Sequence, residues 1–142
     1  MFGLGTMTTL ESNTVTVNAP PEKVYNFLSD FRNFSELMPA QIEDWKATSE
    51  DCSFTIKGMT QLGMKYKKKI PHSLIEVERN GRVPVDFTLR CTIKGQQKSE
   101  VKFEFEAELN PMMKMLAERP LTNFLNLLTG KLQELFASDK KA

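Results

Sequence analysis

Residues 99–111 constrain the fold of this chain more than any other stretch, because apolar and charged side chains alternate strictly along it. The apolar positions are Val101, Phe103, Phe105, Ala107 and Leu109, and the charged ones are Glu100, Lys102, Glu104, Glu106 and Glu108. This period of two indicates a strand with one buried and one solvated face. Asn110-Pro111 then marks a helix start. A one-sided sheet that leads into one long helix is expected to wrap around that helix and enclose an apolar chamber.

The composition indicates one globular domain. The chain has 142 residues, 40% of them hydrophobic, and a net charge of +1, so nothing in its charge predicts a nucleic-acid partner. No apolar run is long enough for a membrane span, and the first residues lack the pattern of a secretion signal. We therefore expect a cytoplasmic protein without stable membrane insertion, with a flexible leader over residues 1–7, a domain over 8–138 and a flexible tail over 139–142.

The cysteines and the single histidine do not predict a reactive or metal site. Cys52 and Cys91 fall on inward strand positions, where two buried, inert thiols are expected rather than a disulfide. His72 lies in a predicted strand connection and has no companion ligand at metal-binding spacing. The sequence thus predicts neither a metal nor a cofactor.

The rest of the chain predicts short helices followed by a meander. A strand is expected over residues 8–17, a helix from Pro20-Pro21, and a second short helix carrying Phe34, Leu37 and Met38. From about residue 42 to 109, six alternating segments joined by short connections predict antiparallel strands, including a hairpin at Asn80-Gly81. Together they give a sheet of about seven strands.

The outer face of this sheet is predicted to be charged. Lys65, Lys67 and Lys69 are expected there, near Glu76 and Glu78 on the next strand. A solvated face with cross-strand charge pairs explains this pattern better than a nucleic-acid site, because no aromatic side chains interleave on that face. Tyr66 alternates with the lysines and is expected to point inward.

The last helix is predicted over residues 111–136, with a broad apolar arc suited to a curved sheet. Pro120 lies inside it and is expected to kink or interrupt it. The methionines at 112, 113 and 115 precede that point, and they either line a site for varied apolar ligands or simply fill the core. The arc comprises Met113, Leu116, Ala117, Pro120, Phe124, Leu127, Leu128 and Leu135, widened by Met112, Leu121, Leu125 and Leu132.

The complete element order and one local segment carry a family resemblance. Residues 17–34, which open with Val17-Asn18-Ala19-Pro20-Pro21 and close with Arg32-Asn33-Phe34, resemble the start of the START/SRPBCC superfamily. That superfamily includes polyketide cyclase/dehydrase-like, coenzyme Q-binding and birch-pollen-allergen-like proteins. The resemblance implies an α+β helix-grip fold, in which a curved antiparallel sheet grips the C-terminal helix around an apolar cavity. Members bind lipids, sterols, quinones, polyketides or plant hormones, and some are enzymes.

The leading hypothesis is a noncatalytic binding or carrier protein for a small hydrophobic or amphipathic ligand, with Tyr66 as its polar contact. Alternatively, the inward side chains fill the interior. A cyclase- or dehydratase-type enzyme would need an acid or base, for which Tyr66 and Arg79 are candidates; Lys68 is the other charged residue expected near that face. An interaction module is a third possibility, and monomer and homodimer are both open. The expected ligand-binding residues are Phe54, Ile56, Met64, Tyr66, Ile75, Val77, Phe87, Leu89, Phe103, Phe105, Met113, Leu116, Pro120 and Phe124.

Overall fold

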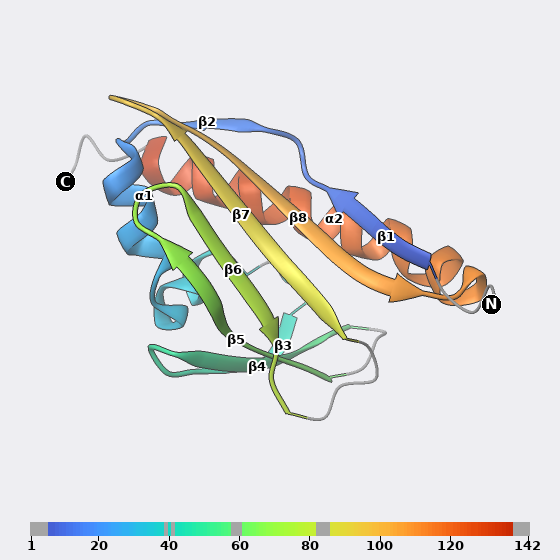
Figure 1. Ribbon diagram of the computed structural model, residues 1–142. Helices are drawn as coiled ribbons and strands as arrows, with labels where there is room; N and C mark the ends of the chain where they lie inside the picture. The colour runs from blue at the N-terminus through green and yellow to red at the C-terminus, as the bar shows by residue number, and fades with distance from the viewer. Residues whose placement is uncertain (1–5, 39, 41, 58–60, 82–85, 138–142) are drawn as a thin grey trace.

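The computed structural model of the protein describes residues 6–38, 40, 42–57, 61–81 and 86–137, and its element order matches the prediction. Two short helices follow the N-terminal strands, a meander comes next, and one long helix ends the chain (Figure 1). The elements are β1 (Thr6–Glu11), β2 (Val15–Val17), α1 (Pro21–Leu28), the 3-10 helix η1 (Phe31–Glu36), β3 (Ile42–Ala47), β4 (Asp51–Ile56), β5 (Gln61–Ile70), β6 (Leu74–Arg79), β7 (Phe87–Gly95), β8 (Ser99–Leu109) and α2 (Pro111–Ala137).

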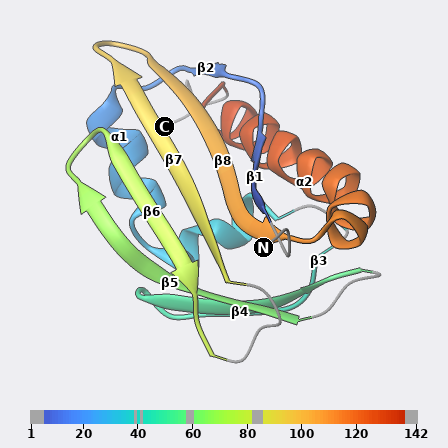
Figure 2. The same ribbon diagram turned by 45° about the vertical axis from the view of Figure 1, so that its right-hand side comes forward.

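The strands form one antiparallel sheet in the order β1-β8-β7-β6-β5-β4-β3, with β2 also paired to β8. The sheet is strongly curved, and α2 lies on its concave side along β8 and the N-terminal strands (Figure 2). The helix-grip fold class is therefore confirmed. The part of the chain that the structure describes has eight strands rather than the predicted number of about seven, because the N-terminal strand is divided.

A bulge divides the strand that was predicted over residues 8–17. Glu11 pairs with Glu104 and Val15 with Val101, so four steps on one strand match three on the other. Ser12 keeps contact with β8, since it exchanges hydrogen bonds with the backbone of Phe103. The extra residue reverses which positions face inward, as bulges do. Residues 6 and 7, assigned to a leader from the sequence, belong to β1; residues 1–5 and 138–142 lie outside the described residues.

The C-terminal helix begins where the sequence predicts. The side-chain oxygen of Asn110 accepts a hydrogen bond of 2.8 Å from the backbone N–H of Met113, which caps the first turn. The expected interruption at Pro120 is wrong, because α2 runs through it to Ala137. Pro120 is exposed, so water can bond the backbone carbonyl that a proline leaves without its helical partner.

The convex face is charged, as predicted, but its centre is an arginine that the sequence analysis did not single out. Arg90 donates hydrogen bonds of 2.7 Å to Glu76, 3.0 Å to Glu104 and 3.1 Å to Glu106, across β6, β7 and β8. Partial burial by itself raises the pKa of Glu104, but hydrogen bonds from Arg90 and Lys102 outweigh burial and lower it. This network holds three strands in register.

We predict that Arg90→Met lowers the free energy of unfolding at neutral pH by about 1–3 kcal/mol, because it leaves three neighbouring carboxylates without their common donor. Arg79→Met is the matched control: Arg79 and Asp86 form a far more exposed ion pair, and its loss should cost less than about 1 kcal/mol. Urea unfolding of the three proteins measures both effects.

The pH dependence of that difference follows from the lowered pKa of Glu104. A carboxyl with a depressed folded pKa contributes stability above its unfolded pKa and loses it as the pH falls through the folded value. The gap between wild type and Arg90→Met should therefore be full above about pH 5 and close in acid. An equal gap at all pH values would show that Arg90 acts through packing rather than through its charge.

Candidate functional site

The strands bring the predicted ligand-binding residues together on the concave face. Nine of the ten strand residues expected there are buried, and Tyr66 is half-buried. The nine are Phe54, Ile56, Met64, Ile75, Val77, Phe87, Leu89, Phe103 and Phe105. Because they come from β4 to β8, they form one apolar surface that faces α1, η1 and α2. Their role in binding a ligand stays a prediction.

Aromatic side chains fill much of the space between this surface and the helices. Phe54 and Phe124 stack with ring centres 6.2 Å apart, and Phe87 and Phe105 stack at 5.2 Å. At the other end of α2, Phe136 meets Phe27 of α1 edge-on at 5.7 Å. The middle and the C-terminal end of the helix are therefore tightly packed against their neighbours.

The N-terminal part of α2 is covered much less. From Leu121 to Phe136 the buried side chains recur at helical spacing, whereas between Pro111 and Pro120 only Met113 and Ala117 are even half-buried. The placement of Leu116 and Pro120 in the interior is wrong, because both are exposed. The side chains at positions 113, 117, 121 and 124 form one stripe that faces the sheet, and in the first turns the positions on either side of this stripe point away from it. Met112, Met115 and Leu116 consequently expose 69%, 77% and 70% of their surface.

Tyr66 points inward as predicted, but its hydroxyl is bonded to the protein. It donates a hydrogen bond of 2.6 Å to the backbone carbonyl of Leu28, at the end of α1, and its ring stacks on Phe31 at 4.2 Å. Burial, followed by the charge of Asp30, raises the pKa of the Tyr66 hydroxyl. Tyr66 thus stays protonated and fixes α1 to the sheet, a role that its alternation with lysines does not reveal.

A second bulge places Lys69 beside Tyr66. Tyr66 pairs with Val77 but Lys68 pairs with Glu76, so Lys67 is the extra residue. The predicted faces of Lys68 and Lys69 are therefore exchanged. Lys68, expected near the concave face, lies on the convex face, and Lys69, expected on the convex face, lies opposite buried Ile75 on the concave face.

Lys69 completes the end of α1. Its ammonium donates 3.1 Å to the carbonyl of Ser29 and lies 4.0 Å from the centre of the Tyr66 ring. Carbonyls at a helix C-terminus lack partners within the helix and attract positive charge. Tyr66 and Lys69 supply both the donors and the charge, so this corner is structural.

The remaining candidates are also engaged or buried. Arg79 lies at a strand end, where it donates 3.1 Å to Asp86. His72 lies in the turn before β6 and packs edge-on against Tyr25. Cys52 and Cys91 are free and buried, as predicted, and burial raises the pKa of the Cys52 thiol to about 12 and that of Cys91 further.

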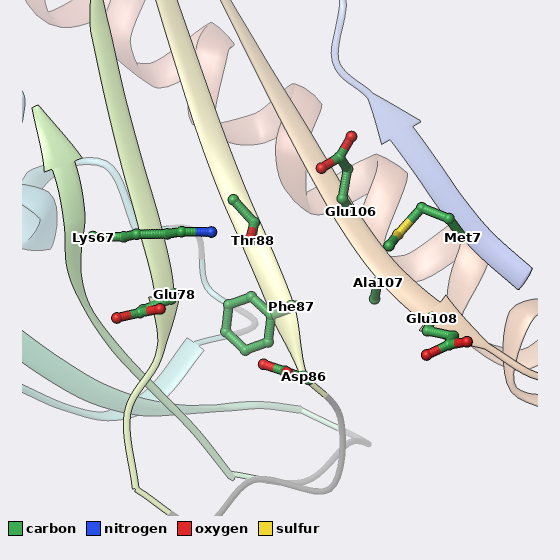
Figure 3. A pocket seen from close by; sticks show the side chains of 9 residues that line it. All are labelled: Met7, Lys67, Glu78, Asp86, Phe87, Thr88, Glu106, Ala107 and Glu108. Carbon is green, nitrogen blue, oxygen red and sulfur yellow. The ribbon is translucent and has the colours of Figure 1, made fainter. Parts of the chain in front are cut away.

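One hollow on the convex face is shown in Figure 3. It measures about 240 Å³ and lies over the ends of β6, β7 and β8. Its polar lining consists of Lys67, Glu78, Asp86, Thr88, Glu106 and Glu108, to which Met7, Phe87 and Ala107 add apolar atoms. Ligand pockets usually exceed about 300 Å³ and are mostly apolar, so this depression is part of the solvated face.

Comparison with protein families decides the affiliation of the chain. A family model described as polyketide cyclase/dehydrase and lipid transport matches residues 9–136, which is almost the whole domain. The chain belongs to this family. No curated protein matches the sequence. The START/SRPBCC resemblance of residues 17–34 is thus confirmed on evidence that covers both the sheet and the final helix.

Solved structures show the same fold at low sequence identity. A norcoclaurine synthase point mutant from Thalictrum flavum, in complex with a transition-state analogue, aligns with a TM-score of 0.74 at 14% identity over 96% of this chain and 98% of that one. A START superfamily protein from Mycobacterium smegmatis aligns at 0.69, with 13% identity over 92% and 97%. An uncharacterised protein from Bacillus thuringiensis aligns at 0.70, with 13% identity over 94% and 100%. Among the described residues, no helix is both long enough and apolar enough to cross a membrane.

We predict that Tyr66→Phe lowers the free energy of unfolding by about 1–2 kcal/mol, because it leaves the Leu28 carbonyl without its donor. Binding of the neutral fluorescent probe N-phenylnaphthylamine should not change, since the hydroxyl is already used within the protein. Chemical denaturation and fluorescence titration test the two effects. Weaker probe binding at unchanged stability would instead make Tyr66 a ligand contact.

Both thiols should resist modification in the native state, because each is buried and only the thiolate reacts. We expect a bulky aromatic disulfide reagent to label Cys52 and Cys91 only at the rate of unfolding, and to label both at once in denaturant. Cys52→Ser and Cys91→Ser assign the two signals. Fast labelling of either native thiol would contradict the packing described here.

Proposed function

We propose that this protein binds and carries a small hydrophobic or amphipathic ligand, held between the concave face of the sheet and the N-terminal half of α2. Membership of a family of polyketide cyclases, dehydrases and lipid transport proteins supports this proposal. The fold supports it as well, because a curved sheet that grips a helix presents apolar surface from both elements to the same space.

The uneven packing of α2 carries the proposal. Leu125, Leu128 and Leu132 are at most 1% exposed, whereas the turns that begin at Met112 are largely open to solvent. Within these open turns, Met113 and Ala117 are half-buried against the core. An apolar ligand can enter here by displacing a methionine side chain, which is flexible and adapts to different shapes. A helix that served only to cover the sheet would not need an exposed N-terminal part.

The candidate acid–base groups favour binding over catalysis. Tyr66 donates its proton to the Leu28 carbonyl, and Arg79 is paired with Asp86 near solvent. A general acid or base must reach the reacting group of a substrate, and both side chains are held elsewhere by partners in the protein. We therefore prefer a carrier to an enzyme of the cyclase or dehydratase type.

The test is a matched pair of tryptophan substitutions in α2. Met113→Trp adds bulk to the half-buried position, where it should fill the entrance and lower the affinity for N-phenylnaphthylamine at least about tenfold with little change in melting temperature. Met115→Trp makes the same change at an exposed position two residues away, and its affinity should stay within about twofold of wild type. Fluorescence titration and thermal unfolding are measured on all three proteins.

Two results would overturn the proposal. The first is a wild-type protein that does not take up the probe, which would leave the interior as packed core. The second is a fall in stability of about 1–3 kcal/mol in Met113→Trp with unchanged probe affinity, because overpacking of a filled core has that effect. Native mass spectrometry of the gently purified wild-type protein provides an independent measurement, since a retained ligand adds its mass.

A further inference from the structure

Thr8 is an exception among the buried hydroxyl groups of this protein. Its side chain is 5% exposed, and its oxygen has no hydrogen-bond partner among the residues that the structure describes. The other three buried hydroxyls of the described residues are used: Ser99 donates to the Ala19 carbonyl, Thr129 donates to a carbonyl in its own helix, and Ser12 bonds β8. A buried hydroxyl without a partner destabilises the folded state, so its presence needs an explanation.

The hydroxyl group lies on the face that binds α2. Thr8 pairs with Ala107, and Ala107 pairs with Phe87, so the three side chains form one row across β1, β8 and β7. All three are buried, which places the row on the concave face. Ala107 is the smallest of the apolar residues in β8, so its side chain occupies little space between Thr8 and Phe87.

Two hydrogen bonds show which part of α2 passes over this row. The Asn126 side chain accepts from the N–H of Asn13, and the Gln133 side chain donates to the carbonyl of Thr16. Seven helical residues and three extended residues each span about 10 Å, so helix and strand advance together. From Asn126 back to Met113 the helix covers about 20 Å, and from Asn13 back to residue 7 the extended chain covers the same distance. Met113 is therefore level with residues 7 and 8. Thr8 therefore lies beneath the open end of the helix.

The neighbourhood of Thr8 determines which polar group it can accept. The flanking inward side chains are Leu10, Phe105 and Leu109, all buried and apolar. The cations on this part of α2, Lys114 and Arg119, are exposed. A carboxylate or phosphate placed beside Thr8 would lose its water without gaining a counter-ion, which is strongly unfavourable. A neutral carbonyl or hydroxyl needs only one hydrogen bond there.

We infer that Thr8 is the polar contact for the ligand, and that the ligand is a neutral molecule with a carbonyl or hydroxyl group rather than an acid. This inference rests on the proposed function and specifies the class of ligand. In it, the hydroxyl of Thr8 donates to a ligand carbonyl or accepts from a ligand hydroxyl, while the apolar body of the ligand packs beneath Met113 and Ala117.

The experiment compares Thr8→Val, which has nearly the same shape but no hydroxyl, with Thr8→Ser, which keeps the hydroxyl. Two neutral fluorescent probes are used: the naphthyl ketone prodan and N-phenylnaphthylamine, which has no carbonyl. We expect Thr8→Val to weaken prodan binding by about 3- to 10-fold, the range of one hydrogen bond. N-Phenylnaphthylamine binding should not change, and Thr8→Ser should bind both probes as wild type does. Thr8→Val should melt at the same temperature or higher.

The possible failures can be told apart. If the wild type binds neither probe, the proposed function fails. If it binds both and Thr8→Val affects them equally or not at all, the hydroxyl is not a ligand contact, and this inference alone is overturned. If the anionic probe anilinonaphthalene sulfonate binds more tightly than prodan and loses affinity in Thr8→Val, the assignment of a neutral ligand is wrong.

Discussion

The strict alternation along β8 is the constraint on which the rest of this structure depends. β8 pairs with β7 on one side and with β1 and β2 on the other, so its register orients the strands at that end of the sheet. Its inward side chains from Val101 to Leu109 are buried, and each would be exposed on a single sheet without a cover. α2 follows β8 after one residue and is long enough to cover this face. The grip of the sheet on the helix is therefore a consequence of one strand that is apolar on one side.

The two short helices are attached by a different kind of interaction. At the end of α1, the Leu28 carbonyl accepts from Tyr66 and the Ser29 carbonyl from Lys69, while Asn33 donates to the carbonyl of Phe27. These bonds satisfy backbone groups that no helix can satisfy by itself. Tyr66 and Lys69 thus serve the fold at one end of the concave face, whereas Thr8 and the half-buried Met113 lie at the opposite end, near the start of α2.

The sequence predicted the architecture well because alternation along a whole strand remains recognisable when a single position is misassigned. The alternation in β4, β7 and β8 assigned their inward residues correctly, and Asn110-Pro111 located the start of α2. Two of the errors have the same cause: a bulge adds a residue, and every position after it changes face. This explains the divided strand near Ser12 and the exchange of Lys68 and Lys69.

The predictions for Leu116 and Pro120 were wrong for another reason, since an apolar arc on a helix does not show how much of that arc the sheet covers. Arg90 was missed because its three partners are distant in sequence.

The bulge in β5 has a consequence for how this strand tolerates change in length. Lys67, Lys68 and Lys69 are consecutive and identical, so removal of any one of them gives the same chain. A chain with two lysines would have a regular register, in which the first lysine lies opposite Glu76 on the convex face and the last still lies opposite Ile75 on the concave face. The bulge therefore lets the run lose one lysine without changing the face of the sheet that receives the positive charge.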